Sequence, residues 1–361
     1  MVKGATAVPN YIKANKSYSE TYNKDAVGDG PTYYADWSNK ELLWFYKQFY
    51  TDFAAKYDHD PRIAFVQAGF GHWGEYHIYG TTLELGKNFA TKDYQAEFLT
   101  HLDSLFKETP WSISIDVAGN KTLLALNFGL FDDSFMHKEH DISQGNGDNE
   151  RNWRDLGTDR WKTAPGGGEV SYYTEKDQRE FLNPAGLYGV TWEDAAAKYH
   201  MTYVIGNDAP EGSYATKDRV YEASSYAGYK FEITGYAVNG ISAAVRVKDI
   251  GIAPLYHNAY VTVNGVRSEK SLKGLLPGDK LLKGATIPYK ANLSASAEVI
   301  AGLLDENGTT AIAGARSLTH DKGKGASKDA SNLGKTRSTD LKGRNVPGKA
   351  AKGAYYPISK H

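Results

Sequence analysis

Cysteine does not occur anywhere in this chain of 361 residues. Its absence excludes disulfide bonds, thiolate metal sites and cysteine nucleophiles. Long apolar runs are also missing, so the sequence predicts no membrane-spanning helix and no membrane partner. The segment Met1-Val2-Lys3-Gly4 lacks the apolar core of a signal peptide, so we expect any targeting segment to be absent from this chain.

Net charge is nearly absent too, because 42 Lys and Arg residues balance 43 Asp and Glu residues. This balance argues against a general polyanion binder. From Arg316 to His361, however, eleven Lys and Arg residues stand against three Asp residues. The basic residues alternate with glycine and lack interleaved aromatics, so we interpret residues 319–361 as a solvated Gly/Lys/Ser-rich tail and predict no nucleic-acid partner.

The length exceeds the size at which single hydrophobic cores stop growing, which predicts two domains. Between residues 60 and 208 the chain repeats a pattern of helix, apolar strand and then a polar or charged residue. That order is typical of a parallel β/α barrel, whose active site lies at the carboxyl ends of the strands. After Tyr226, short alternating strands separated by Asn-Gly turns indicate hairpins. We therefore predict an α/β fold, with a partial TIM-type β/α barrel over residues 1–222 and an antiparallel β-sandwich over residues 223–318.

Individual elements are predicted from the spacing of apolar residues. We expect helices over residues 39–56, 93–107 and 191–198, with Ser38 or Asn39 as the N-cap of the first. We expect strands starting at Ile63 and over residues 111–116, 123–131, 162–170 and 201–205. Residues 1–36 are predicted to be irregular, and residues 137–160 to form a long functional loop.

The segment from Ile63 to His77 carries the strongest functional signal. Its apolar start is followed by glycines among aromatic side chains, two histidines and the carboxylate of Glu75. The glycines would let a substrate or a neighbouring backbone approach closely. Carboxylate, indole and imidazole groups together are typical of a sugar-binding site, whereas a lone glutamate more often only ties down a loop. A second glutamate, Glu169, follows Gly166-Gly167-Gly168 and favours the functional interpretation.

Several short motifs resemble a known group of enzymes. They are Gly71-His72-Trp73-Gly74-Glu75-Tyr76-His77, Phe131-Asp132-Asp133-Ser134-Phe135, Gly167-Gly168-Glu169, Ile250-Gly251-Ile252-Ala253-Pro254-Leu255-Tyr256 and Leu275-Leu276-Pro277-Gly278-Asp279. With these motifs the chain resembles the clan A glycoside hydrolases of the TIM-barrel type, and more closely an uncharacterised bacterial family that joins such a barrel to a C-terminal β-sandwich of unknown function.

The resemblance implies a proton donor at the end of the fourth barrel strand and a nucleophile at the end of the seventh. Glu75 and Glu169 occupy these positions if the strand starting at Ile63 is the fourth. The segment before residue 60 is then too short for three further strand–helix units, so another chain or a missing N-terminal segment is expected to complete the barrel. An enzyme of this kind would be secreted and act in the periplasm or outside the cell, although a cytoplasmic location stays open.

The predicted function is hydrolysis of a polysaccharide or oligosaccharide by a retaining, two-glutamate mechanism. We expect Glu75 to be the acid/base and Glu169 the nucleophile. The residues expected to bind the substrate are His72, Trp73, His77, Asp132, Trp161 and Asn207. Structural roles stay open for the histidines, and simple loop capping stays open for Asp132.

Two other interpretations are less favoured. A metal site is not expected, because the order His-x-x-Glu-x-His lacks the helical spacing of zinc proteases, and no cofactor is predicted. Gly166-Gly167-Gly168 is not followed by the Lys-Ser/Thr pair of a P-loop. The alternative function is a non-catalytic carbohydrate-binding or cell-surface scaffold protein that has the same cluster of residues without a working catalytic pair.

Overall fold

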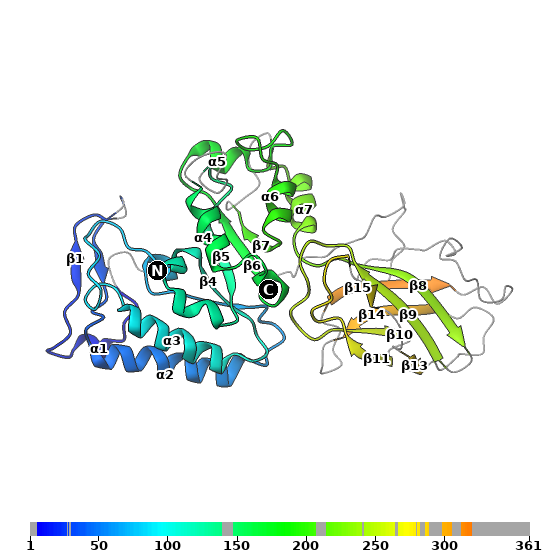
Figure 1. Ribbon diagram of the computed structural model, residues 1–361, viewed down its shortest axis with the longest axis horizontal. Coiled ribbons are helices and arrows are strands. Elements are labelled where there is room, and N and C mark those ends of the chain that lie inside the picture. The colour runs from blue at the N-terminus through cyan, green and yellow to red at the C-terminus, as the bar shows by residue number, and fades with distance from the viewer. Residues whose placement is uncertain are drawn as a thin grey trace. The chain divides into compact units, whose positions relative to one another are not determined.

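A computed structural model describes residues 6–319 except for residues 27, 29, 139–146, 207–213, 240–241, 264–265, 279, 282–285, 289–297 and 305–311 (Figure 1). Asn207 and, apart from Thr319, the predicted tail lie outside the described residues, and so does the side chain of Trp73. Within the described part of the chain, no helix has the length and apolar character that crossing a membrane requires.

The fold is mixed α/β and contains a five-stranded parallel sheet in the order β3-β4-β5-β6-β7. Its strands are β3 (Val66–Ala68), β4 (Trp111–Ser114), β5 (Gly129–Phe135), β6 (Gly166–Val170) and β7 (Met201–Ile205). Neighbouring parallel strands need a crossover connection, and this is why helical segments separate them in the sequence. The structure confirms the prediction of an α/β fold with a parallel sheet, and the barrel and the β-sandwich stay predictions. Because the strands are parallel, their carboxyl ends share one edge of the sheet.

The chain divides into two compact units, Met1–Asp177 and Gln178–His361. The predicted boundary at residue 222 stays a prediction. Besides its strands of the parallel sheet, the first unit contains α1 (Asn10–Lys13), β1 (Thr21–Asn23), β2 (Thr32–Tyr34), α2 (Lys40–Tyr57), η1 (His72–Gly74), α3 (Lys92–Leu105), η2 (Ile115–Gly119), η3 (Lys121–Ala125), α4 (Asp148–Leu156) and η4 (Arg160–Lys162). The short helix α5 (Glu175–Glu180) includes the boundary between the units.

Helices α2 and α3 run side by side in the first unit (Figure 1). The side chain of Asn39 accepts a hydrogen bond from the backbone N–H of Leu42, which confirms Asn39 as the N-cap of α2. An aromatic core joins the helices, with the rings of Tyr46 and Phe98 4.7 Å apart. The hydroxyl of Tyr46 also donates to the backbone oxygen of Gly69, so this core holds the chain just beyond β3.

Three predicted strands are shorter than expected, since β3 starts at Val66, β4 ends at Ser114 and β6 starts at Gly166. Three other predicted segments differ in the kind of structure that they form. Residues 123–131 begin in the 3₁₀ helix η3 and become strand only at Gly129, since a short apolar run does not distinguish a strand from a buried helical turn. The expected loop 137–160 contains α4, whose two buried apolar side chains, Trp153 and Leu156, lie one turn apart. The expected irregular region 1–36 contains α1 and the antiparallel pair β1–β2.

The second unit contains α6 (Trp192–Lys198), α7 (Lys217–Tyr226) and two antiparallel sheets, with β7 belonging to the parallel sheet. One sheet has the order β11-β10-β14-β15, and in the other β9 pairs with β8, β12 and β13. The strands are β8 (Phe231–Asn239), β9 (Ser242–Asp249), β10 (Tyr260–Val263), β11 (Val266–Ser271), β12 (Lys280–Leu281), β13 (Thr286–Pro288), β14 (Glu298–Leu304) and β15 (Ile312–Thr319).

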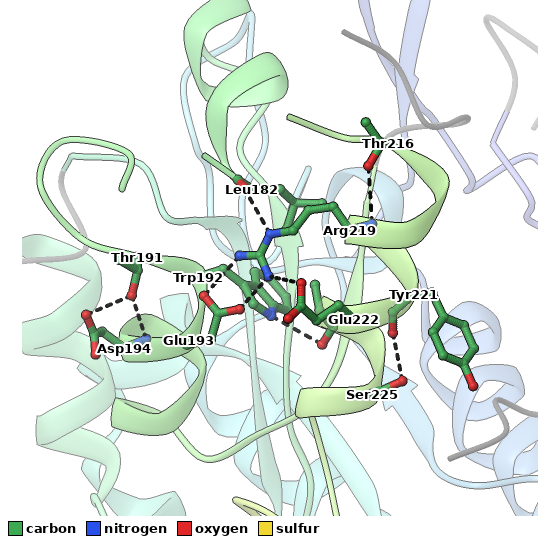
Figure 2. Close-up of polar contacts among 11 residues, drawn as sticks. Leu182, Thr191, Trp192, Glu193, Asp194, Thr216, Arg219, Tyr221, Glu222 and Ser225 are labelled. Atoms are coloured by element: carbon green, nitrogen blue, oxygen red, sulfur yellow. Dashed lines mark hydrogen bonds and ion pairs between the residues drawn. The ribbon is translucent and has the colours of Figure 1, made fainter. Parts of the chain in front are cut away.

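Arg219 joins α6 to α7 (Figure 2). Its guanidinium group makes a two-point ion pair with Glu193, at 2.6 and 3.0 Å, and donates a further hydrogen bond to the backbone oxygen of Leu182. This bidentate geometry suits the planar guanidinium group, and it lowers the pKa of Glu193. The ion pair between Arg219 and Glu193 thereby holds the two helices together.

A buried aspartate at the end of β9 should make the second unit sensitive to pH. Oδ1 of Asp249 accepts hydrogen bonds from the backbone N–H groups of Lys230 and Gly251, at 2.9 and 2.8 Å. Its Oδ2 is buried and has no hydrogen-bond partner among the described residues. Burial raises the pKa of Asp249 from 3.8 to about 6. A carboxyl group whose pKa is higher in the folded state stabilises the fold below the unfolded pKa, and this contribution is lost as pH rises through the folded pKa.

We therefore expect the free energy of unfolding to fall by about 3 kcal/mol from this group between about pH 4 and about pH 6. Asp249→Asn replaces the carboxyl group with a neutral amide of the same shape, so the variant should not show that decline. Urea titrations of both chains across this pH range measure the difference, because the other titrating groups are shared. Parallel pH profiles for the two chains would contradict the prediction.

Candidate active site

The chain makes a tight turn between Gly69 and His77, at the carboxyl end of β3. The backbone oxygen of Glu75 accepts hydrogen bonds from the N–H groups of Phe70 and Gly71, and the oxygen of His77 accepts one from the N–H of His72. A Cβ atom at Gly69 would lie 1.5 Å from the oxygen of Gly74, and one at Gly71 would lie 2.1 Å from the oxygen of His77. Glycine at positions 69 and 71 thus permits close contact with the returning backbone, and the turn fixes where Glu75 lies.

Five carboxylate side chains occur along the carboxyl edge of strands β3 to β6, and we call them the carboxylate cluster. Glu75 follows β3 through η1, and Asp116 follows β4 in η2. Asp132 and Asp133 lie within β5, and Glu169 lies within β6, next to the strand end. The parallel order of the four strands brings these separate sequence positions to one edge.

The imidazole ring of His77 lies among these carboxylates. Its Nε2 is 3.1 Å from Oε2 of Glu75, and its Nδ1 is 2.9 Å from Oδ2 of Asp116. The same Nδ1 is 3.6 Å from Oδ2 of Asp133. A protonated His77 therefore hydrogen-bonds Asp116 through Nδ1 and forms an ion pair with Glu75 on its Nε2 side.

The crowding of negative charge shifts two pKa values strongly. Burial by itself would lower the pKa of His77, but hydrogen bonds with Asp116 and Glu75 and the charge of Asp133 raise it to about 10. Burial and the charges of Asp132, Glu75 and Asp116 raise the pKa of Asp133 to about 8, against the opposing effect of His77. Both shifts have the same cause, because several carboxylates share a small volume: the charged form of His77 is favoured and the charged form of Asp133 is disfavoured.

Glu75 and Glu169 lie within electrostatic reach of each other. Burial raises the pKa of Glu169, and the negative charge of Glu75 raises it further. A hydrogen bond with Tyr172 acts in the opposite direction and favours the charged form of Glu169. Glu75 is the more buried of the two, since only 5% of it is exposed.

Exposed tyrosines lie beside the cluster. The ring of Tyr79 is 4.6 Å from that of His77, and its hydroxyl interacts with Tyr173, which is 63% exposed. Tyr172 is half exposed and contacts Glu169. These residues offer aromatic faces and hydroxyl groups next to the carboxylates, a combination suited to sugar rings.

A buried polar group anchors the chain that carries Tyr172 and Tyr173. Ser171 Oγ donates to Oδ2 of Asp177 at 2.8 Å, and Nδ1 of His137 lies 2.7 Å from the same oxygen. The ring of His137 also lies 4.9 Å from that of Tyr173. The connection after β6 is thereby tied to the end of β5.

The structure brings only some of the predicted binding residues to the cluster. His77 lies at its centre, and the His72 ring stacks on Tyr34 at 5.2 Å and lies 6.1 Å from the ring of Tyr79. Asp132 is 2% exposed, and its Oδ1 accepts hydrogen bonds from Ser134 N and Asn149 Nδ2, both at 3.0 Å. This arrangement matches the loop-capping alternative for Asp132.

Trp161 is not brought to the cluster. It lies in η4, before β6 begins, whereas Glu169 lies near the end of that strand. A residue preceding a parallel strand lies at the amino edge of the sheet, opposite the carboxylate cluster. Trp73 and Asn207 stay predictions, because the side chain of the first and the whole of the second lie outside the described residues.

Sequence reasoning did not assign functional roles to Asp116, Asp133, Tyr79, Tyr172 and Tyr173. The two aspartates follow the same pattern as Glu75, a charged residue where an apolar strand ends or is about to end, and the pattern could have indicated them. The adjacent Tyr172 and Tyr173, shortly after Glu169, are a weaker signal. No sequence signal indicates Tyr79, because its position beside His77 depends on the turn between Gly69 and His77.

One trio could hold a cation. Glu75, His77 and Asp133 each offer a ligand atom, and these atoms lie within 4.8 Å of one another. Carboxylate oxygens with one imidazole nitrogen suit several divalent metals. The same three residues are already linked by hydrogen bonding and charge, so the arrangement is satisfied by a proton on His77 as well.

In comparisons with known proteins, no family model and no curated protein matches this chain.

Proposed function

We propose that the protein is a retaining glycoside hydrolase that acts on a polysaccharide or oligosaccharide through Glu75 and Glu169. The observation that supports this most is the electrostatic coupling of the two glutamates, since the charge of Glu75 raises the pKa of Glu169. They come from different strands of one sheet edge and lie beside exposed tyrosines. Retaining enzymes need two carboxyl groups about 5 to 5.5 Å apart, one protonated and one charged.

In the proposed reaction, Glu75 donates its proton to the oxygen of the leaving group as the glycosidic bond breaks. The carboxylate of Glu169 attacks the anomeric carbon and forms a covalent glycosyl ester. Glu75, now charged, then takes a proton from a water molecule, which attacks the same carbon and releases Glu169. Two inversions give a product with the configuration of the substrate.

The neighbouring residues would support this chemistry in distinct ways. A protonated His77, held by Asp116, would place its positive charge beside Glu75 and stabilise the Glu75 carboxylate when it is charged between the two steps. Asp133, whose pKa is raised, can in its protonated form donate a hydrogen bond to a sugar oxygen, which a charged carboxylate cannot do. Tyr79, Tyr172 and Tyr173 offer faces on which sugar rings can stack.

The proposal extends to fold and family. We propose that the parallel sheet is part of a TIM-type barrel of the clan A kind, whose remaining strands would continue the sheet at β3. Two observations on the described residues support a barrel: the strands follow one another in the sheet in chain order, and β3 lies at an edge of the sheet. The two antiparallel sheets would form the β-sandwich, and the contact of β11 with β13 supports their packing. A polysaccharide-degrading enzyme of this type would act outside the cell or in the periplasm.

The test is a screen of nitrophenyl glycosides and of algal and plant polysaccharides with the complete chain. Hydrolysis should occur, and proton NMR should first detect the product anomer with the substrate's configuration. Activity should also persist after treatment with a chelator, because no step needs a metal. An inverted product would contradict the mechanism. Binding of a polysaccharide without any hydrolysis would instead support the non-catalytic carbohydrate-binding alternative.

A further inference from the structure

A second feature of the first unit lies on α2, on the helix face that bears Trp44 and Phe49. These side chains are 54% and 47% exposed, which is unusual for large apolar residues side by side on one helix. With Phe45 and Phe53 they line a groove of about 470 Å³ that also includes Tyr11 of α1. Gln48, Asp52 and Lys56 contribute its polar lining.

The residues of α2 that line the groove follow helical spacing. With position 41, they fall into two rows along one face of α2, with one residue every four positions: 41, 45, 49 and 53 in one row and 44, 48, 52 and 56 in the other. The rings of Phe45 and Phe49 are 6.2 Å apart and those of Phe49 and Phe53 are 5.9 Å apart, which makes a continuous aromatic stripe. A stripe of this kind is typical of a helix that packs against another helix.

The stripe carries opposite charges at its two ends. Glu41 lies at its start and Lys56 at its end, about 22 Å apart at 1.5 Å per residue. Within the described part of the chain neither forms an ion pair, although Glu41 accepts a hydrogen bond from the hydroxyl of Tyr11 at 3.3 Å. The midpoint between positions 41 and 56 falls between Gln48 and Phe49, at the middle of the stripe.

We propose that this face of α2 is an interface between two copies of the chain, related by a two-fold axis that passes between Gln48 and Phe49. In this antiparallel arrangement Glu41 of each copy faces Lys56 of the other, and Trp44 faces Phe53. The same surface is used on both copies, as a two-fold interface requires. One helix face is small for a stable interface, so the dimer should form with micromolar affinity.

Charge reversal tests this pairing. Glu41→Lys and Lys56→Glu each create two like-charge contacts per dimer, and each should weaken association roughly tenfold. Mixing the two variants should restore it, because a heterodimer of one with the other again has two opposite-charge contacts. The double variant should likewise dimerise like the wild type. Sedimentation velocity at low and high micromolar concentration measures the fraction of dimer for the wild type, for each variant and for the mixture.

Matched controls separate the pairing from indirect effects. Glu84→Lys reverses an exposed charge away from α2 that pairs with Lys87, and it should have no effect. Phe49→Asp should abolish dimers while circular dichroism shows an intact fold.

A wild-type chain that stays monomeric at high micromolar concentration would overturn the proposal. Dimers that are insensitive to both reversals, or variants that do not recover on mixing, would overturn it too. If Phe49→Asp abolished binding to an insoluble polysaccharide while the wild type stayed monomeric, the stripe would be a carbohydrate surface instead. The result is independent of catalysis, since none of these residues belongs to the carboxylate cluster.

Discussion

Replacing Glu169 with glutamine should lower kcat on the best substrate by roughly 10³-fold or more, because the amide cannot attack the anomeric carbon. Glu75→Gln should have a comparable effect on substrates with poor leaving groups and a smaller one on nitrophenyl glycosides, whose leaving group needs little protonation. Both variants should still bind the sugar, since glutamine has the shape of glutamate. Initial rates and isothermal titration calorimetry measure the two properties separately.

The matched control is Glu84→Gln, an exposed glutamate that pairs with Lys87 away from the cluster. It should leave kcat unchanged. If Glu75→Gln and Glu169→Gln hydrolysed substrate at the wild-type rate, the two-glutamate mechanism would be wrong.

Two observations point in opposite directions on which glutamate carries the proton. The raised pKa of Glu169 favours it as the acid, whereas its hydrogen bond with Tyr172 favours it as the charged nucleophile. Alanine variants with added azide decide between these roles. In the acid/base variant azide attacks the glycosyl enzyme and gives a glycosyl azide of retained configuration. In the nucleophile variant azide fills the vacated space, attacks the substrate directly and gives the inverted product. We expect retention with Glu75→Ala and inversion with Glu169→Ala.

Gly69→Ala should destabilise the first unit by roughly 3 kcal/mol or more and remove activity as well. The added methyl group would lie 1.5 Å from the oxygen of Gly74 and 2.8 Å from the nitrogen of Glu75, so the turn has to open. Opening it moves Glu75 away from His77. Chemical denaturation and the kcat of the remaining folded protein measure the two effects.

Two other glycines make a graded series with Gly69. Gly74 has a positive φ of 84° but open space around its Cβ position, so Gly74→Ala should cost only about 1 to 2 kcal/mol. Gly119 has neither a positive φ nor a neighbour within 4 Å, and Gly119→Ala should be neutral or slightly stabilising. Equal losses at positions 69 and 119 would show that backbone contact is not the cause.

Much of the secondary structure could be predicted because it depends on local spacing. Neighbouring residues predicted the N-cap of α2 to within two candidates, of which Asn39 is the observed one, and predicted the full length of β7, Met201–Ile205. Errors arose where local signals are ambiguous, as at residues 123–131, where one apolar run contains a 3₁₀ helix followed by the start of a strand. Helix α4 was missed because only two of its nine residues, Trp153 and Leu156, are apolar, so the sequence shows little helical periodicity.

The sequence alone determined the alternation of helices and apolar strands, and hence a parallel sheet with polar residues at its carboxyl edge. It could not determine which polar residues meet, because that depends on strand order, on register and on the turn after β3. Only the tertiary structure set His77 between Glu75 and Asp116 and left Trp161 at the other edge. The physical reason is that charge interactions depend on distance in space, and side chains dozens of residues apart become neighbours only through the packing of strands.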